Sequence, residues 1–273
     1  MNANNLTISV PNLGCNKNCP YCVSKMTGMM ESNFSLMQRN IPKVTTVARA
    51  AGVTSVLFTG KGEPLLNFGD LLTLLERFCD WPCELQTNGL SLLEYDFRRS
   101  FLARASAHLD TLAVSIDRLA DFERFRAVFS AARDSGLNTR ATLNVTRLLS
   151  PASHPEPTLS ELLSLSRAAA IDQLTLRNIS IPEGVPEDDP RARWIRDNSA
   201  DALFGKLVEE VRQGRLVRML PYGAKAYDLS GISVAFFEYC VQDRNSADDI
   251  RSLIFQEDGH LYTTWNSRAS ILL

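Results

Sequence analysis

The sequence predicts an α/β protein, a partial (β/α)6 TIM-like barrel with a small C-terminal antiparallel β extension. Short β-branched or apolar runs alternate with longer amphipathic runs through most of the chain. Such alternation is typical of parallel strands joined by right-handed helical crossovers. Six strand–helix units are visible, which indicates an open barrel rather than a complete eight-fold one. After about residue 215, short strands separated by turns replace this alternation.

The spacing of apolar residues gives each element its bounds. The predicted strands are Leu6–Val10, Val53–Thr59, Cys83–Thr87, Thr111–Ile116, Thr139–Val145 and Leu174–Ile179. Helical periodicity covers residues 35–51, 67–79, 92–106, 119–135, 158–170 and 199–213. Two irregular, Pro- and charge-rich stretches follow predicted strands, at Ser150–Thr158 and Pro182–Asn198. We expect both at the carboxyl ends of the strands, the face that carries the active site in barrel enzymes.

The C-terminal segment predicts two hairpins. Residues 224–228 and 232–240 flank a turn at 229–231. Residues 252–256 and 260–265 flank Asp258-Gly259, a dipeptide that strongly favours a tight hairpin turn. We therefore expect a barrel over residues 1–215 and a β-hairpin extension, residues 216–273, packed on it.

Composition narrows the class of protein. The chain has 273 residues, a net charge of −2 and 45% hydrophobic residues, which suits a globular domain with a large core. No apolar run approaches the roughly 18 residues of a membrane span, and the N-terminus lacks a signal-peptide pattern. We expect a cytoplasmic protein whose main partner is neither a membrane nor a nucleic acid. Six cysteines in that compartment indicate metal ligands or core residues rather than disulfides.

The strongest motif is a triplet of cysteines, Cys15, Cys19 and Cys22, directly after the first predicted strand. Three thiolates on one loop can bind one metal centre, and a [4Fe-4S] cube would keep one iron without a cysteine. An open coordination position is what a catalytic metal needs. A zinc knuckle that lacks a ligand and a chance cluster of buried thiols remain alternatives.

Three motifs together resemble the radical SAM superfamily over about residues 5–180. They are the cysteine triplet with an aromatic residue before its last member, a Gly-Glu-Pro segment after the second strand and an Asn-Gly turn after the third. The resemblance implies a [4Fe-4S] cluster whose open iron binds S-adenosylmethionine (SAM). It also implies a one-electron reductant, such as flavodoxin or ferredoxin, and cleavage of SAM to methionine and a 5′-deoxyadenosyl radical.

The resemblance assigns cofactor contacts to the ends of the second and third strands. Gly60, Gly62 and Glu63 match the segment that binds the SAM amino group, although Lys61 replaces a glycine of the usual pattern. This lysine would place a cation near the methionyl carboxylate or the substrate. Thr87 and Asn88 would line the SAM side of the barrel. Ordinary turns are the alternative for both segments.

Further cofactor contacts fall on later strands. Ser115 and Asp117 share one face of the fourth strand and suit the ribose and ammonium of SAM, although Asp117 could instead cap a helix. Asn144 and Arg177 are polar residues in apolar runs and could contact SAM or substrate; for Arg177 a structural ion pair is the alternative. Tyr21 would pack beside the adenine, or serve as a core aromatic residue.

Four residues of the C-terminal segment are candidates for substrate contact, because this segment could close over the open side of the barrel. They are Arg251, His260, Tyr262 and Trp265. A hairpin that only shields the sheet edge is the alternative. Cys79, Cys83 and Cys240 are interpreted as packed thiols.

These observations predict a radical SAM enzyme that abstracts hydrogen from a small molecule, with a nucleotide-like molecule as one candidate. The cofactors would be a [4Fe-4S] cluster and SAM. Two alternatives stay within the superfamily: an activase of a partner enzyme, and an enzyme that modifies peptides or proteins. A tRNA-modifying enzyme should carry a basic patch, which is not visible. A non-catalytic iron–sulfur or zinc module is the last alternative.

Overall fold

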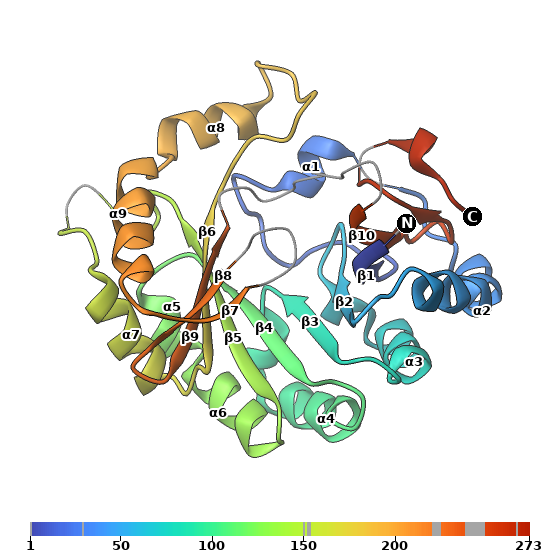
Figure 1. Ribbon diagram of the computed structural model, residues 1–273, viewed down its shortest axis with the longest axis horizontal. Coiled ribbons are helices and arrows are strands. Elements are labelled where there is room, and N and C mark those ends of the chain that lie inside the picture. Colours follow the sequence, from blue (N-terminus) through green and yellow to red (C-terminus); the bar gives the residue numbers. More distant parts are fainter. Residues whose placement is uncertain are drawn as a thin grey trace.

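The computed structural model describes residues 2–28, 30–149, 151, 154–219, 225–237, 249–265 and 267–273. In these residues one mixed sheet of eleven strands runs in the order β11-β10-β1-β2-β3-β4-β5-β6-β9-β8-β7. Helices lie along the outer side of this sheet, while α1 and α8 lie near its upper edge in Figure 1.

The bounds of the elements follow the hydrophobic periods closely. The strands are β1 Asn2–Ser9, β2 Ser55–Thr59, β3 Cys83–Thr87, β4 Thr111–Ile116, β5 Asn138–Val145, β6 Gln173–Asn178, β7 Arg215–Met219, β8 Lys225–Leu229, β9 Ile232–Phe237, β10 Asp249–Phe255 and β11 Leu261–Tyr262. The helices are α1 Val23–Thr27, α2 Phe34–Ala50, α3 Phe68–Phe78, α4 Tyr95–Ala105, α5 Ala120–Arg124, α6 Arg126–Asp134, α7 Leu159–Ala168, α8 Pro190–Asn198 and α9 Asp201–Arg212. Short 3-10 helices cover Pro64–Asn67, Leu90–Leu93 and Arg268–Ser270.

One predicted loop contains a helix. The stretch 182–198 was expected to be irregular, but its last nine residues form α8. Asp189 caps this helix by accepting from the backbone N–H groups of Arg191 and Ala192, and Pro190 occupies the first turn. The helix is strongly polar, so its apolar periodicity gives little signal, whereas the Asp-Pro pair marks where it begins.

The α/β class with a mostly parallel sheet is confirmed, but the sheet is not closed. Strands β1 to β6 pair in parallel with their neighbours in chain order. The prediction of six strand–helix units omitted two further parallel strands, which come from the C-terminal segment. Strand β9 pairs with β6, and β10 pairs with β1. The guanidinium of Arg251 on β10 lies 5.6 Å from the ring centroid of Phe237 on β9. The two ends of the parallel part therefore approach each other without strand pairing between them.

The C-terminal segment also contains the antiparallel hairpins. Strand β8 pairs antiparallel with β9, and β10 pairs antiparallel with β11 through the Asp258-Gly259 turn. Most of residues 216–273 that are described belong to the same sheet as residues 1–215. The division of the chain at residue 215 remains a prediction.

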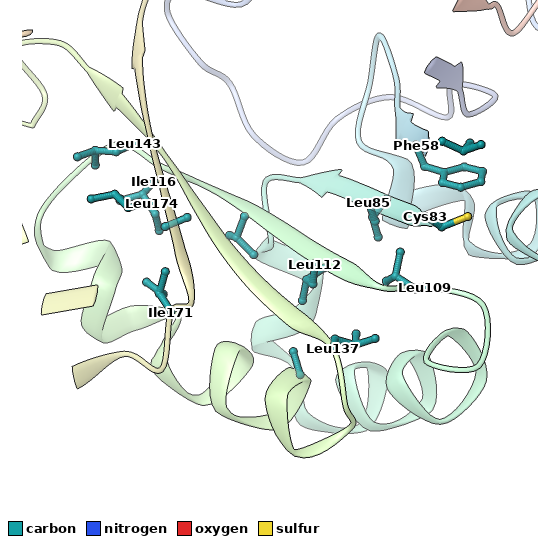
Figure 2. Packing of buried hydrophobic residues seen from close by; sticks show 14 of the residues in the cluster. Phe58, Cys83, Leu85, Leu109, Leu112, Ile116, Leu137, Leu143, Ile171 and Leu174 are labelled. Carbon is teal, nitrogen blue, oxygen red and sulfur yellow. The ribbon is translucent and has the colours of Figure 1, made fainter. Parts of the chain in front are cut away.

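The core lies between the outer face of the sheet and its helices. Figure 2 shows buried side chains such as Phe58, Leu85 and Leu112 in this layer. Alternate residues of the same strands point to the opposite, inner face, for example Glu84 and Gln86 on β3. The inner face is polar, and the carboxyl ends of the parallel strands meet at one edge above it. No described helix combines the length and apolar character that crossing a bilayer requires.

Candidate functional site

The cysteine triplet lies on the loop that joins β1 to α1, at the carboxyl ends of the strands. Cys15 is exposed, Cys19 and Cys22 are half-buried, and all three are free thiols. The sulfur of Cys15 accepts hydrogen bonds from the backbone N–H of Lys17 at 3.4 Å and the side-chain amide of Asn88 at 3.6 Å. Thus the end of β3 contacts the first cysteine of the loop.

The donor set suits an iron–sulfur cluster. Three unpaired thiols lie within eight residues of one loop. Among the described residues, no group of three or more Cys, His, Asp or Glu side chains is already close enough together to hold a metal ion. Burial raises the pKa of the Cys19 thiol to about 11, against the opposing effect of Lys17. Metal binding at this thiol would therefore have to displace its proton. Cys15, Cys19 and Cys22 are the residues that would hold the cluster.

The glycine-containing segment after β2 packs directly against the cysteine loop. A Cβ atom at Gly62 would lie 1.9 Å from Oδ1 of Asn12 and 2.4 Å from the carbonyl oxygen of Gly14. The next residue, Glu63, donates its backbone N–H to the same carbonyl at 2.9 Å. A Cβ at Gly60 would meet the carbonyl oxygen of Val10 at 3.3 Å. Both glycines therefore allow a close approach of two backbones, and their contact with SAM remains a prediction.

The buried carboxylate of Glu63 is bound by protein donors. Its Oε1 accepts from the hydroxyl of Thr87 at 2.5 Å and the N–H of Leu65 at 3.0 Å, and its Oε2 accepts from the N–H of Asn88 at 2.8 Å. Burial raises the pKa of Glu63, although these hydrogen bonds oppose the shift. Glu63 thus joins the ends of β2 and β3 and brings Thr87 and Asn88 beside the loop.

The carboxylate of Asp117, at the end of β4, binds three side-chain donors. Its Oδ2 forms an ion pair with Nζ of Lys17 at 2.5 Å. Its Oδ1 accepts from the hydroxyl of Tyr21 and from the amide of Asn144 at 2.8 Å. The amide of Asn144 also lies 3.2 Å from the Tyr21 hydroxyl. Three predicted cofactor residues, Tyr21, Asp117 and Asn144, therefore contact one another.

The ring of Tyr21 is buried against the polar helix α8. Its centroid lies 5.5 Å from that of Trp194, and Ile179 and Ile195 belong to the same small apolar cluster. Burial, followed by the nearby charge of Asp117, raises the pKa of the Tyr21 hydroxyl above its usual range. The hydroxyl therefore stays protonated and donates to that carboxylate.

Lys61 is buried just after the end of β2. Its ammonium donates to the carbonyl oxygen of Gly28 at 2.7 Å. Burial lowers the pKa of Lys61, and the charge of Glu257 partly opposes this shift. Glu257 itself accepts from the N–H of Asn12 at 2.8 Å and the hydroxyl of Ser32 at 2.7 Å. The C-terminal segment thus supports the base of the cysteine loop.

Ser115 and Arg177 lie on the inner face. Strand register places Ser115 beside Thr142, places Thr142 beside Thr175, and places Asn144 beside Arg177. Arg177 is partly exposed, and its side chain forms no ion pair or hydrogen bond within the described residues. The ion pair considered as its alternative role is therefore absent from this part of the chain.

The C-terminal candidates are held mainly by local contacts. The ring of His260 bonds a backbone oxygen of Leu273 at 2.9 Å, and the hydroxyl of Tyr262 donates to Asp258 at 2.7 Å. Arg251 lies over Phe237, and Trp265 is partly buried. Among the described residues, these hydrogen bonds of His260 and Tyr262 stay within the C-terminal segment, and contact of the four candidates with substrate remains a prediction.

The remaining cysteines fall outside the site. Cys83 is buried, as expected of a packed thiol. Cys79 is exposed, so its interpretation as a buried thiol is wrong: it follows the last residue of α3 at the protein surface. Cys240 lies outside the described residues.

Sequence reasoning missed three residues that shape the site: Lys17, Trp194 and Glu257. Lys17 stands inside the cysteine motif, where a cation between two ligands was a detectable signal. Trp194 and Glu257 are about 170 to 240 residues away along the chain, and only folding brings them to the loop.

Part of the chain is similar in sequence to known proteins. A family model described as a 4Fe-4S single cluster domain matches residues 6–118. A GTP 3',8-cyclase from Clostridium acetobutylicum is 30% identical over 151 residues, 53% of this chain and 45% of that protein. A 7-carboxy-7-deazaguanine synthase from the same organism is 35% identical over 91 residues, 33% of this chain and 40% of that protein. The chain therefore spans less than half the length of these relatives.

A solved structure shares the fold over nearly the whole chain. Streptococcus suis SuiB bound to precursor peptide SuiA aligns with a TM-score of 0.60 and 14% identity, covering 96% of this chain and 60% of SuiB. SuiB bound to S-adenosylmethionine aligns with a TM-score of 0.59. At this identity the likeness shows the fold alone.

Proposed function

We propose that this chain, as a member of the radical SAM superfamily, is an enzyme. It would use SAM to abstract hydrogen from a small polar molecule. The observation that carries the proposal is the cysteine loop, with three free thiols at the carboxyl ends of parallel strands. When bound there, the cluster supplies the electron that cleaves SAM to methionine and a 5′-deoxyadenosyl radical.

The protein's contribution would be to hold the loop and to orient SAM. Glu63 and Asn88 fix the ends of β2 and β3 against the loop. Ser115 offers a hydroxyl, and the partly exposed guanidinium of Arg177 offers a cation to a carboxylate. We infer that the curved sheet acts as a partial barrel around these groups, and that flavodoxin or ferredoxin delivers the electron.

The inner face supports a polar substrate. Below the cysteine loop, Arg140 pairs with Glu84 at 2.5 Å and donates to Gln173 at 2.8 and 3.0 Å. Above this network lie the short side chains of Ser115, Thr142 and Thr175. Glu84, Arg140 and Ser115 are partly exposed, so solvent reaches this face. Polar groups that solvent can reach suit a ligand rich in hydrogen-bonding groups.

We favour a nucleotide-like substrate within this class. The names of the two Clostridium relatives refer to GTP and to a 7-deazaguanine, both purine-type molecules. The peptide bound by SuiB makes a peptide substrate the second candidate, supported by the shared fold.

The test is anaerobic reconstitution with iron and sulfide. We expect a brown protein with about four irons per chain, which yields 5′-deoxyadenosine from SAM when dithionite replaces the natural reductant. Cys19→Ala should lose both properties. Cys79→Ala is the matched control, because this exposed cysteine lies away from the loop, and it should behave as the wild type. A colourless zinc protein, or a Cys19→Ala variant that still cleaves SAM, would overturn the proposal.

A further inference from the structure

Two residues of the cysteine loop reach the same carboxylate. Lys17 stands between Cys15 and Cys19, and Tyr21 stands between Cys19 and Cys22. The ammonium of Lys17 pairs with one oxygen of Asp117 at 2.5 Å, and the hydroxyl of Tyr21 donates to the other. One side chain at the end of β4 thus holds the loop on both sides of Cys19.

The carboxylate of Asp117 binds donors through both oxygens and is nearly inaccessible. The side chain of Asp117 is 8% exposed and that of Lys17 is 23% exposed. The amide of Asn144 on β5 adds a third donor at 2.8 Å. Both oxygens of this buried carboxylate are bound by donors of the protein, and removing its cation partner leaves an uncompensated charge. A ligand at this carboxylate would have to compete with two residues of the cysteine loop, Lys17 and Tyr21.

The backbone around Asp117 is also fixed. Asp121 accepts from the N–H groups of Asp117 and Arg118 at 3.1 and 3.0 Å. The β4 strand pairs with β3 and β5 on both sides. The carboxylate therefore extends from a rigid element, whereas Cys15, Cys19 and Cys22 lie on a loop without regular structure.

We propose that Asp117 is a positioning residue of the cysteine loop and not a direct ligand of SAM. By binding Lys17 and Tyr21 together it sets the place of Cys19, and through Cys19 the place of the cluster. This role rests on the proposed function, since it assumes that the loop carries the cluster. Contacts to SAM at this edge then come from Ser115, Arg177 or backbone groups.

The two roles of Asp117 predict different mutant patterns. In the positioning role, Lys17 and Asp117 act as one unit, so either substitution should cause a similar defect and the double substitution little more. In the direct role, Lys17→Met would free the carboxylate for SAM, while Asp117→Asn would weaken SAM binding without loss of iron.

The experiment compares the reconstituted wild type with Lys17→Met, Asp117→Asn and the double variant. Tyr21→Phe is a fourth variant that keeps the ring packed on Trp194 but removes its hydroxyl donor. Lys43→Met is the control, because Lys43 is an exposed lysine of α2 that lies outside the cysteine motif. The readouts are iron retained after gel filtration, SAM affinity by equilibrium dialysis and the midpoint potential of the cluster by EPR-monitored titration.

We expect roughly ten-fold weaker retention of iron in each single variant, as is typical when partners of metal ligands are removed. The double variant should retain as much iron as the single variant that retains less, and Lys43→Met should match the wild type. The midpoint potential should fall in Lys17→Met, which leaves a negative charge near Cys19, and rise in Asp117→Asn, which leaves a positive one. The double variant should lie between them. A purely structural defect would not give shifts of opposite sign.

Two outcomes would overturn the inference. One is normal iron retention in Asp117→Asn with weakened SAM binding, which would make Asp117 a direct ligand. The other is additive loss in the double variant, which would show that Lys17 and Asp117 act separately. If the wild type itself bound no cluster, the proposed function would fail instead, so the two failures are distinguishable.

Discussion

Several residues of the candidate site make contacts within the protein that hold the cysteine loop in place. Glu63 matches a SAM-binding motif, yet its carboxylate accepts from Thr87 and from two backbone N–H groups. Gly62 matches the same motif, and its lack of a Cβ atom is what admits Asn12 and Gly14. At the residue scale, the motif's first physical role is to bring the β2 segment against the cysteine loop.

Gly62→Ala should therefore destabilise the loop. The added methyl would meet Asn12 and a backbone oxygen well inside contact distance, and overpacking of this kind costs about 1–3 kcal/mol. We expect that loss in the free energy of unfolding of the metal-free protein, measured by urea denaturation, together with weaker iron retention. The control is Gly69→Ala in α3, where nothing lies within 4 Å of the added atom. Equal stability of Gly62→Ala and the wild type would contradict this account.

Among the elements, the β10–β11 turn does more than shield a sheet edge. Glu257 is fully buried there and accepts from Asn12 of the cysteine loop and Ser32 before α2. The backbone oxygen of Glu257 also accepts from the N–H of Asn33 at 2.7 Å. The turn therefore fixes the start of the cysteine loop and the entry to α2 together.

Replacement of Glu257 by Ala should lower the free energy of unfolding of the metal-free protein. The N–H of Asn12 and the hydroxyl of Ser32 would lose their acceptor, and a buried donor without a partner costs about 1–3 kcal/mol. Lys61 would also lose a favourable charge. Chemical denaturation followed by circular dichroism measures the change. Glu209→Ala is the control, since its ion pair with Arg212 is largely exposed and should contribute less than about 1 kcal/mol. A similar loss in both variants would argue against a supporting role for the turn.

For the whole molecule, the C-terminal strands complete the sheet at both ends of its parallel part. Strand β10 pairs with β1 and β9 pairs with β6. Phe255 on β10 belongs to the same buried cluster as Phe58 on β2 and Phe129 on α6. This continuity predicts that the N-terminal and C-terminal segments unfold together.

Phe255→Ala should accordingly destabilise the entire chain in one transition. Truncation of a fully buried phenylalanine costs about 3–5 kcal/mol, and the side chain of Phe255 has no exposed surface. Thermal unfolding should show one shifted transition, and hydrogen exchange should accelerate in β1 and β5 as well as in β10. Leu216→Ala on the edge strand β7, where the side chain is 48% exposed, should change little. A separate early transition limited to residues 216–273 would instead favour two independent units.

The sequence by itself determined the α/β class, the approximate positions of the first six strands and the cysteine triplet. These features depend on local periodicity and on spacing within one loop, which a linear pattern records directly. Only the tertiary structure decided that Lys17 and Tyr21 meet at Asp117, that Glu257 supports Asn12, and that β9 and β10 extend the parallel sheet. The partners in these contacts lie about 100 to 245 residues apart in most cases. Which buried polar groups pair with each other depends on how the core brings the strand ends together. Such pairing produces no periodic pattern in the sequence.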